Sequence, residues 1–252
     1  MNKIICIANQ KGGVGKTTTA INLASSLAAA EKKTLLIDGD SQGNATSGIG
    51  MTNNGTNLYH ALIGKVPLED TIHPTAVPNL DIITANQDLI GVEVEFIQVN
   101  EREKRLRYLL KTLKAPYDFI IIDCPPSLGI MTINALVAAE FLIVPLQCEY
   151  FALEGLGSLL NTVKLVKAKL NPELTLGGIL LTMFDSRNLL SHSVTEEVKK
   201  HFGNKVFKTI IPRNVRLSES PSHGLPIILY DIKSRGAMAY MALAQEIIEG
   251  GL

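Results

Sequence analysis

The chain has 252 residues, of which 46% are hydrophobic and 19% are charged. This balance excludes a disordered protein, because chains that stay unfolded combine low hydrophobicity with high net charge. The 24 basic and 24 acidic side chains cancel, so binding to nucleic acid or to a membrane would need a local patch. No apolar stretch approaches the ~20 residues that span a bilayer, and no signal peptide fits before the first predicted strand. We therefore expect a cytoplasmic protein.

Short apolar runs of strand length alternate with helix-length segments along the whole chain. Several runs are apolar at every position, as in central parallel strands that are covered on both faces. The predicted strands are 4–8, 34–38, 80–83, 119–123, 141–145, 176–183 and 206–211. The predicted helices are 16–30, 102–113, 131–139, 153–170, 193–202 and 236–249. The alternation predicts an α/β fold: one domain over residues 1–252, with a doubly wound, mostly parallel sheet and helices on both faces.

In such a sheet the ligand lies at the carboxyl ends of the strands. The loops after Ala8, Asp38 and Asp123 should converge there. The first of these loops, NQKGGVGKTTT at residues 9–19, reads as a phosphate-binding loop. Its glycines permit positive φ values, so the backbone N–H groups can surround phosphate oxygens. The loop residues expected to do this are Gly12, Gly13, Val14 and Gly15.

The side chains that end this loop fit a nucleotide and its metal ion. Lys16 supplies a mobile cation for the β and γ phosphates, the Thr17 hydroxyl is placed to ligate Mg²⁺, and Thr18 can bond the α phosphate. A second lysine, Lys11, has no role in this scheme. Gln10 also stands where the common phosphate-loop pattern has its first glycine.

Two further strands end in carboxylates. The run FIIID ends at Asp123, as in a Walker B strand whose aspartate holds Mg²⁺ through water. The second strand ends in Asp38-Gly39-Asp40. Asp38 is either part of the metal shell or the residue that fixes a turn. Asp40 precedes a polar, switch-like segment, so we expect it to orient or deprotonate the attacking water.

With these residues assembled, the sequence resembles the ParA/Soj family of partition ATPases, in the deviant Walker A class that also holds MinD and the nitrogenase iron protein. The resemblance covers essentially the whole chain. Its motifs are KGGVGKTTT from Lys11, DGDSQGNATSG from Asp38, FIIIDCPPSLG from Phe119, VPLQCEYFALEGL from Val144, LLTMFDSR from Leu180 and IPRNVRLSESPSHG from Ile211. Ser41 departs from the family, which usually has proline there, and this changes the stiffness of the switch segment.

The resemblance assigns roles to individual residues. Lys11 matches the signature lysine, which points outward and crosses a dimer interface to the phosphates of the partner. Gly12 would lie where two protomers press together. Asp40 matches a residue needed for hydrolysis but not for ATP-dependent dimerisation. Pro212 and Asn214 lie in a loop that resembles the adenine-contacting segment.

Residues 187–235 contain nine basic residues and four acids. Such an excess either contacts a DNA backbone without reading bases or is a solvated face. The resemblance favours DNA, since Arg187 and Arg216 match positions implicated in sequence-independent binding to double-stranded DNA. A dimer would double the patch and so link DNA affinity to ATP.

The resemblance implies an ATP-driven homodimer that hydrolyses ATP with Mg²⁺, is stimulated by a ParB/Spo0J-type partner and associates with the nucleoid when ATP is bound. The alternative is a MinD-like membrane-associated positioning ATPase. The final predicted helix lacks the basic residues that membrane attachment needs, so no membrane partner is expected. A third possibility, an iron–sulfur reductase, needs two cysteines per subunit at the dimer axis, whereas Cys6, Cys124 and Cys148 are expected to be core thiols.

Overall fold

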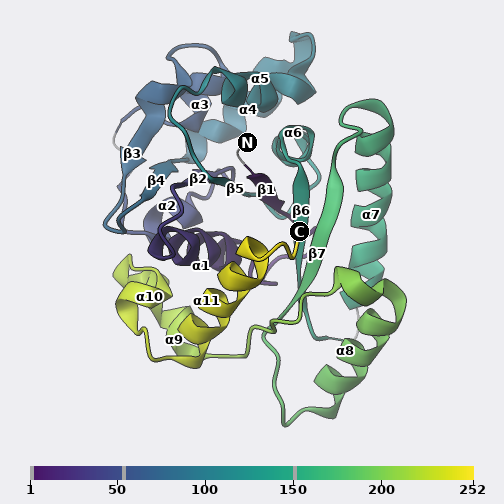
Figure 1. The fold of residues 1–252 in the computed structure, drawn as a ribbon. Coiled ribbons are helices and arrows are strands. Elements are labelled where there is room, and N and C mark those ends of the chain that lie inside the picture. Colours follow the sequence, from purple (N-terminus) through teal and green to yellow (C-terminus); the bar gives the residue numbers. More distant parts are fainter. Residues whose placement is uncertain (1–2, 53–54, 150–151) are drawn as a thin grey trace.

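A twisted sheet runs through the middle of the molecule (Figure 1). The computed structural model describes residues 3–52, 55–149 and 152–252. The strands lie in the order β3-β4-β2-β5-β1-β6-β7, and each neighbouring pair is parallel except β3 with β4. Their bounds are β1 (Lys3–Ile7), β2 (Thr34–Asp38), β3 (Ile72–Pro74), β4 (Leu80–Ile83), β5 (Phe119–Asp123), β6 (Phe141–Gln147) and β7 (Thr175–Thr182). The predicted mostly parallel sheet is confirmed.

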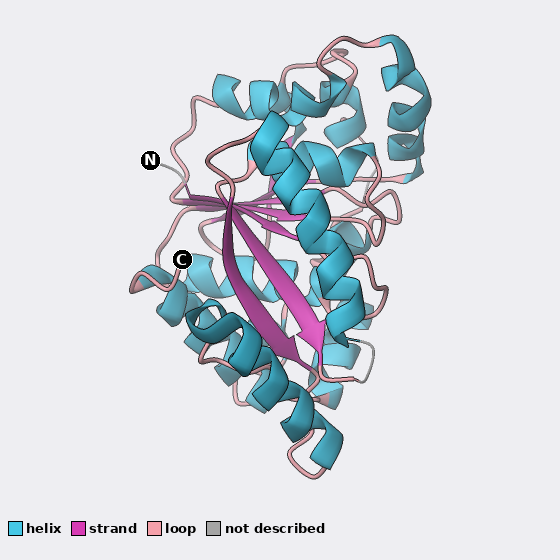
Figure 2. Ribbon diagram, turned by 90° about the vertical axis from the view of Figure 1, so that its right-hand side faces the viewer, coloured by secondary structure: helices cyan, strands magenta, loops and turns pink. Residues whose placement is uncertain are grey.

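Helices cover both faces of this sheet, as Figure 2 shows. One face carries α1 (Lys16–Ala29), α2 (Asn44–Gly48), α9 (Val215–Glu219), α10 (Ile227–Tyr230) and α11 (Arg235–Ile248). The other carries α3 (Leu58–Leu62), α4 (Gly91–Glu95), α5 (Arg105–Thr112), α6 (Ile130–Ala138), α7 (Ala152–Lys169) and α8 (Leu189–Phe202). None of the helices in the described ranges has both the length and the apolarity that crossing a bilayer requires.

Successive strand residues contribute to two separate apolar cores. Leu35 and Ile37 of β2 pack on the α3–α8 side, whereas Leu36 between them packs on the α1–α11 side. This follows from the two-residue period of a strand. It explains why the central strands are apolar at every position, since no face of them is left to solvent.

The predicted strand at 206–211 is wrong. The segment runs beside β7 with isolated bridges at Ile179 with Val206 and at Phe184 with Pro212. The N–H groups of Phe207 and Ile211 donate to Ile179 and Leu181 of β7, but no continuous ladder forms in the described residues. The backbone N–H groups of Lys208 and Thr209 instead donate to the carboxylate of Glu246 in α11, at 2.8 and 3.0 Å. For these two residues, a side chain of the last helix therefore takes the place of a strand partner.

The other predicted elements are confirmed, with small shifts at their ends. α8 starts at Leu189, earlier than predicted, because the side chain of Asn188 accepts a hydrogen bond from the Leu190 N–H and caps the helix. The sequence analysis missed the short elements α2, α3, α4, α9, α10 and β3. They are too short to carry a recognisable hydrophobic period.

The carboxylate of Glu246 gives a testable consequence for stability. Glu246→Ala removes the acceptor of two backbone N–H groups, and we expect the free energy of unfolding to fall by about 1 kcal/mol. Glu249→Ala is the matched control, because Glu249 accepts only from the Gln245 side chain among the contacts seen in the described ranges. Urea unfolding of both variants measures the difference, and equal stabilities would contradict the role of Glu246.

Candidate functional site

The loop between β1 and α1 is shaped to receive an anion. Gly13 and Gly15 have φ values of 74° and 90°, as predicted for glycines at these positions. Gly15 precedes the first residue of α1, and no side chain caps the helix there. The first N–H groups of α1 and the positive end of its dipole are therefore available to a phosphate.

Lys16 is the first residue of α1 and is buried. Its Nζ donates to the carbonyl oxygen of Lys11 at 2.9 Å, so the side chain folds back over the loop. Burial lowers the pKa of the Lys16 amine, and the nearby carboxylates Asp123 and Asp40 oppose this effect. The amine lies on the carboxylate side of the loop, as its proposed role at the phosphates requires.

The carboxylate of Asp123 lacks hydrogen bonds that the other side chains of the site have. It ends β5, in register with Asp38 of β2 on one side and Ile7 of β1 on the other. Both carboxylate oxygens are buried without a hydrogen bond of normal geometry, although the Thr17 hydroxyl lies near enough to lower the pKa. Burial, followed by the charge of Asp38, nevertheless raises the pKa of Asp123 well above its ordinary value.

An unpartnered buried carboxylate is costly, so such a group normally pairs with a cation. A hard divalent ion such as Mg²⁺ takes oxygen ligands, and a threonine hydroxyl with an aspartate carboxylate is a donor set of this kind. The arrangement of Thr17 and Asp123 therefore fits Mg²⁺.

Asp38 anchors the segment that follows β2. Its Oδ2 accepts from the backbone N–H and the hydroxyl of Thr46 at 2.8 and 2.7 Å, and its Oδ1 accepts from the Asp40 N–H at 3.2 Å. Burial raises the pKa of Asp38 to about 6. Of the two roles left open by the sequence, these contacts favour fixing the turn, while a role at the metal stays a prediction.

Asp40 lies in the turn that Asp38 holds. It is buried, and its Oδ1 accepts a hydrogen bond from the Gln42 N–H at 3.0 Å. Gly39 before it packs directly on β5: an added Cβ would lie 2.6 Å from the Asp123 carbonyl oxygen. The close packing at Gly39 therefore ties Asp40 to the end of the strand that carries Asp123.

Lys11 does not project freely from the loop. Its Nζ lies 2.8 Å from Glu149 Oε2, and the two side chains are 41% and 46% exposed. Gln147 at the end of β6 bonds the other oxygen of Glu149. The sequence analysis did not identify Glu149, although it lies inside the VPLQCEYFALEGL motif. Gly12 next to Lys11 has open space around it, since no atom of the described residues would lie within 4 Å of a Cβ added there.

A cavity of about 400 Å³ opens beside the loop. Gly15 and Thr18 form one side of it, and Pro212 and Asn214 form another. This volume lies in the range of small-molecule sites. The loop predicted to contact adenine therefore lines a cavity next to the phosphate loop, as the resemblance requires. Asn214 also caps α9, where its side chain accepts from the Leu217 N–H at 3.3 Å.

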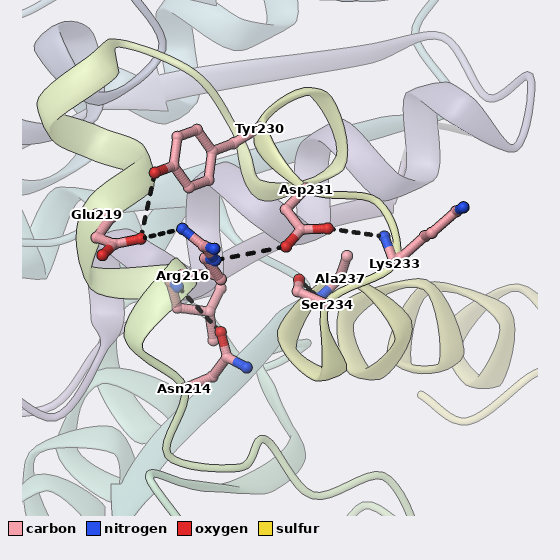
Figure 3. A network of polar contacts seen from close by, with 9 residues as sticks. Asn214, Arg216, Glu219, Tyr230, Asp231, Lys233, Ser234 and Ala237 are labelled. Carbon is pink, nitrogen blue, oxygen red and sulfur yellow. Dashed lines mark hydrogen bonds and ion pairs between the residues drawn. The ribbon is translucent and has the colours of Figure 1, made fainter.

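The two predicted DNA-contacting arginines are both paired with acids. Arg187 is 87% exposed and bonds both carboxylate oxygens of Asp185, at 3.0 and 2.9 Å. Arg216 in α9 bonds Glu219 at 2.9 Å and lies 3.6 Å from Asp231 (Figure 3). Their charges are therefore partly neutralised, which the sequence did not indicate.

Comparison with known sequences decides the family. A family model described as an AAA domain matches residues 2–176. The chain is 57% identical to the chromosome partitioning protein ParA of Myxococcus xanthus, over 99% of this chain and 89% of that protein. It is 55% identical to the sporulation initiation inhibitor protein Soj of Bacillus subtilis, over the full length of both. The chain belongs to the ParA/Soj family of chromosome-partitioning ATPases.

Solved structures share the fold of this ParA/Soj family member. Cobyrinic acid a,c-diamide synthase from Mycobacterium smegmatis, with bound ADP and magnesium, has a TM-score of 0.88 and 35% identity over 100% of this chain and 97% of its own. A putative plasmid partition protein from Borrelia burgdorferi, bound to AMPPNP, has a TM-score of 0.85 and 29% identity over 99% of both chains. The P-loop fold of the family is thus confirmed.

Thr46 of α2 connects the end of β2 to the residues after β4 in this ParA/Soj family member, and this connection can be tested directly. Its hydroxyl donates to Asp38 and accepts from the Ala85 N–H at 3.0 Å. Thr46→Val keeps the shape but leaves a buried N–H unpaired, so we expect the free energy of unfolding to fall by about 2 kcal/mol. Thr46→Ser, which keeps the hydroxyl, should lose less. Urea denaturation measures both, and a Thr46→Val protein as stable as the wild type would contradict the anchor.

Proposed function

We propose that the chain is an Mg²⁺-dependent ATPase that works as a DNA-partitioning switch. ATP binding brings two copies together face to face, and the dimer binds double-stranded DNA without reading its sequence. A ParB/Spo0J-type partner stimulates hydrolysis and so releases the DNA. The observation that carries this proposal is the buried, unpartnered carboxylate of Asp123, beside Lys16 and at the end of a phosphate-binding loop.

Nucleotide binding falls to the loop after β1 and to the cavity beside it. The residues proposed to bind ATP are Lys11, Gly12, Gly13, Val14, Gly15, Lys16, Thr17, Thr18, Pro212 and Asn214. The uncapped start of α1 and the positive φ at two loop glycines support the phosphate contacts. The cavity lined by Pro212 and Asn214 supports the adenine contact. Two solved relatives contain a bound nucleotide, ADP in one and AMPPNP in the other, which supports nucleotide binding by this chain.

Thr17 and Asp123 would hold Mg²⁺, with Asp38 next to them in the adjacent strand. The ion would neutralise charge on the phosphate oxygens. Lys16 would bind the β and γ phosphates and stabilise the charge that develops between them. Asp40 would orient the water that attacks the γ phosphate in line and accept its proton. Burial of Asp40 keeps this carboxylate in place before ATP arrives.

Dimerisation would complete the site. In this proposal Lys11 leaves Glu149 and reaches the phosphates bound to the partner copy. The open surroundings of Gly12 support a contact with another molecule there, since nothing described in this chain requires the absence of a side chain. A larger residue at this position would then act on the assembly rather than on the fold.

DNA binding would use the basic excess of residues 187–235, with Arg187 and Arg216 as contacts. Each arginine must exchange at least part of its acid pairing for a phosphate. That exchange makes binding by one copy weak, and two linked copies raise it through effective concentration. The protein would then be cytoplasmic and associated with the nucleoid when ATP is bound.

A MinD-like role at a membrane is the second candidate, and α11 argues against it. Its apolar residues pack in the core on the α1 side of the sheet, including Tyr240, Leu243 and Ile247. Met238 of this helix is 54% exposed, but a helix that buries most of its apolar face in the protein offers little of it to lipid. We also propose that residues 1–252 form one domain.

Asp40→Ala separates hydrolysis from assembly. Without the carboxylate that orients water, we expect ATP turnover to fall by about 100-fold or more, while ATP still supports a stable dimer that is retained on DNA. Gel filtration and a DNA retention assay with ATP measure both properties. An Asp40→Ala protein that stays monomeric with ATP and is not retained on DNA would contradict both the catalytic assignment of Asp40 and the switch model.

The two loop lysines should fail in different ways. Lys16→Ala removes the cation that serves the protein's own nucleotide, so we expect ATP affinity to fall by about 100-fold. Lys11→Ala should leave ATP bound to a monomer, because its proposed target lies in the partner copy. Fluorescent-nucleotide binding and light scattering distinguish the two. Equal loss of ATP affinity in both variants would assign Lys11 to its own chain.

A further inference from the structure

An unusual surface lies between β4 and α5, over residues 87–98. This segment consists of a 3₁₀ turn (Gln87–Ile90), helix α4 and a second 3₁₀ turn (Phe96–Gln98). Leu89, Val92 and Phe96 anchor it in the core and are at most 2% exposed. In Figure 1 helix α4 of this segment lies beside α3, on the face of the sheet that also carries α5 to α8.

The opposite side of this segment is also apolar. Ile90, Val94 and Ile97 are 56%, 68% and 65% exposed. Their spacing of four and then three residues places them on one stripe of a helical segment. Apolar side chains grouped in this way on an otherwise polar surface mark an interaction site.

The charged side chains within the segment are all acidic, although Lys65 lies over the ring of Tyr59, whose hydroxyl donates to Glu95. Asp88, Glu93 and Glu95 lie in the same segment, all exposed, and residues 86–99 contain no lysine, arginine or histidine. Electrostatic complementarity then favours an occupant with both apolar and basic side chains. It disfavours DNA and membrane surfaces, which carry negative charge. A two-fold contact centred on the stripe would set these acids against the same acids of a second copy.

The surface continues into the proposed catalytic region. A small cavity of about 120 Å³ is lined on one side by Leu89, Ile90 and Glu93. On its other side it is lined by Gly39 and Ser41, the two neighbours of Asp40, and by Pro125 and Ser127 after β5. Ile90 and Glu93 of the surface are therefore next to both segments that follow the proposed catalytic strands.

Glu93 is close to the second of these segments. A Cβ added at Gly129, just before α6, would lie 3.0 Å from Glu93 Oε1. A basic side chain that draws Glu93 outward would change the packing at the start of α6. Contact at this surface can thereby reach the backbone that leads back to Asp123.

We propose that residues 87–98 form the docking surface for an apolar and basic segment of the protein that stimulates hydrolysis. This rests on the function proposed above and assigns that partner a place on the molecule. Ile90, Val94 and Ile97 supply the apolar contact. Asp88, Glu93 and Glu95 select the basic residues.

The test compares Val94→Ser/Ile97→Ser with Leu165→Ser. Leu165 is 61% exposed and lies toward the end of α7, which contributes no described residue to the lining of the small cavity next to Asp40. ATP hydrolysis is measured against increasing concentrations of a purified ParB/Spo0J-type protein from the source organism, with DNA present. We expect the double variant to need about tenfold more partner for half-maximal stimulation. The basal rate of both variants and the partner response of Leu165→Ser should match the wild type.

A charge variant tests the second half of the proposal. Glu93→Gln should weaken partner binding by about threefold and make it less dependent on salt. Binding itself is measured by fluorescence anisotropy with the labelled partner. If the double variant responds like the wild type, or if it loses ATP-dependent dimerisation without partner, the docking surface is overturned.

The binding measurement separates this proposal from the function that it extends. A partner that binds wild type and loses affinity for the double variant supports the surface, even if hydrolysis is not accelerated. That result would contradict only the stimulation step. If the partner does not bind the wild type at all, the docking surface is overturned.

Discussion

The arrangement of the rest of the site depends on the buried carboxylate of Asp123. It ends the central strand β5, between β1 and β2, where the parallel sheet brings three loops together. A carboxylate charge in that position, with no hydrogen bond of normal geometry from the described residues, needs compensation. The start of α1, the amine of Lys16 and the Thr17 hydroxyl lie around it. The fold thus places buried carboxyl groups, one amine and the positive end of a helix dipole at one edge, an arrangement that a metal–phosphate ligand would complete.

Much of the fold could be predicted because the strands are buried on both faces. Runs such as 119–123 are apolar throughout, and such a pattern is typical of a strand at the centre of a parallel sheet. The same pattern misled at 206–211, where Glu246 of α11 supplies the acceptor that a neighbouring strand would have given. Nothing local in the sequence marks that substitution. The short helices between β2 and β5 escaped prediction because tertiary packing, and not their own period, holds them.

The site was predictable where chemistry depends on spacing along the chain. The glycines, Lys16 and the two threonines lie within one loop and helix start, so a pattern of letters identifies them. Contacts between distant segments were not accessible in this way. Glu149 meets Lys11 only because β6 lies beside β1. Arg216 meets Asp231 only because α9 and α10 pack together. A basic residue in a sequence therefore says little about how much of its charge is free.

The pairing of Lys11 with Glu149 also has a consequence for the concentration at which copies of the chain associate. Suppose that Lys11 of each copy leaves Glu149 when two copies meet. Because the assembly is symmetric, the free energy of two ion pairs is then lost on association. A half-exposed pair contributes about 0.5 kcal/mol, so the two together would weaken self-association about fivefold. The ion pair would then oppose association of copies without nucleotide. The attraction between Lys11 and the phosphates of a triphosphate held on the opposite copy would offset this loss of free energy.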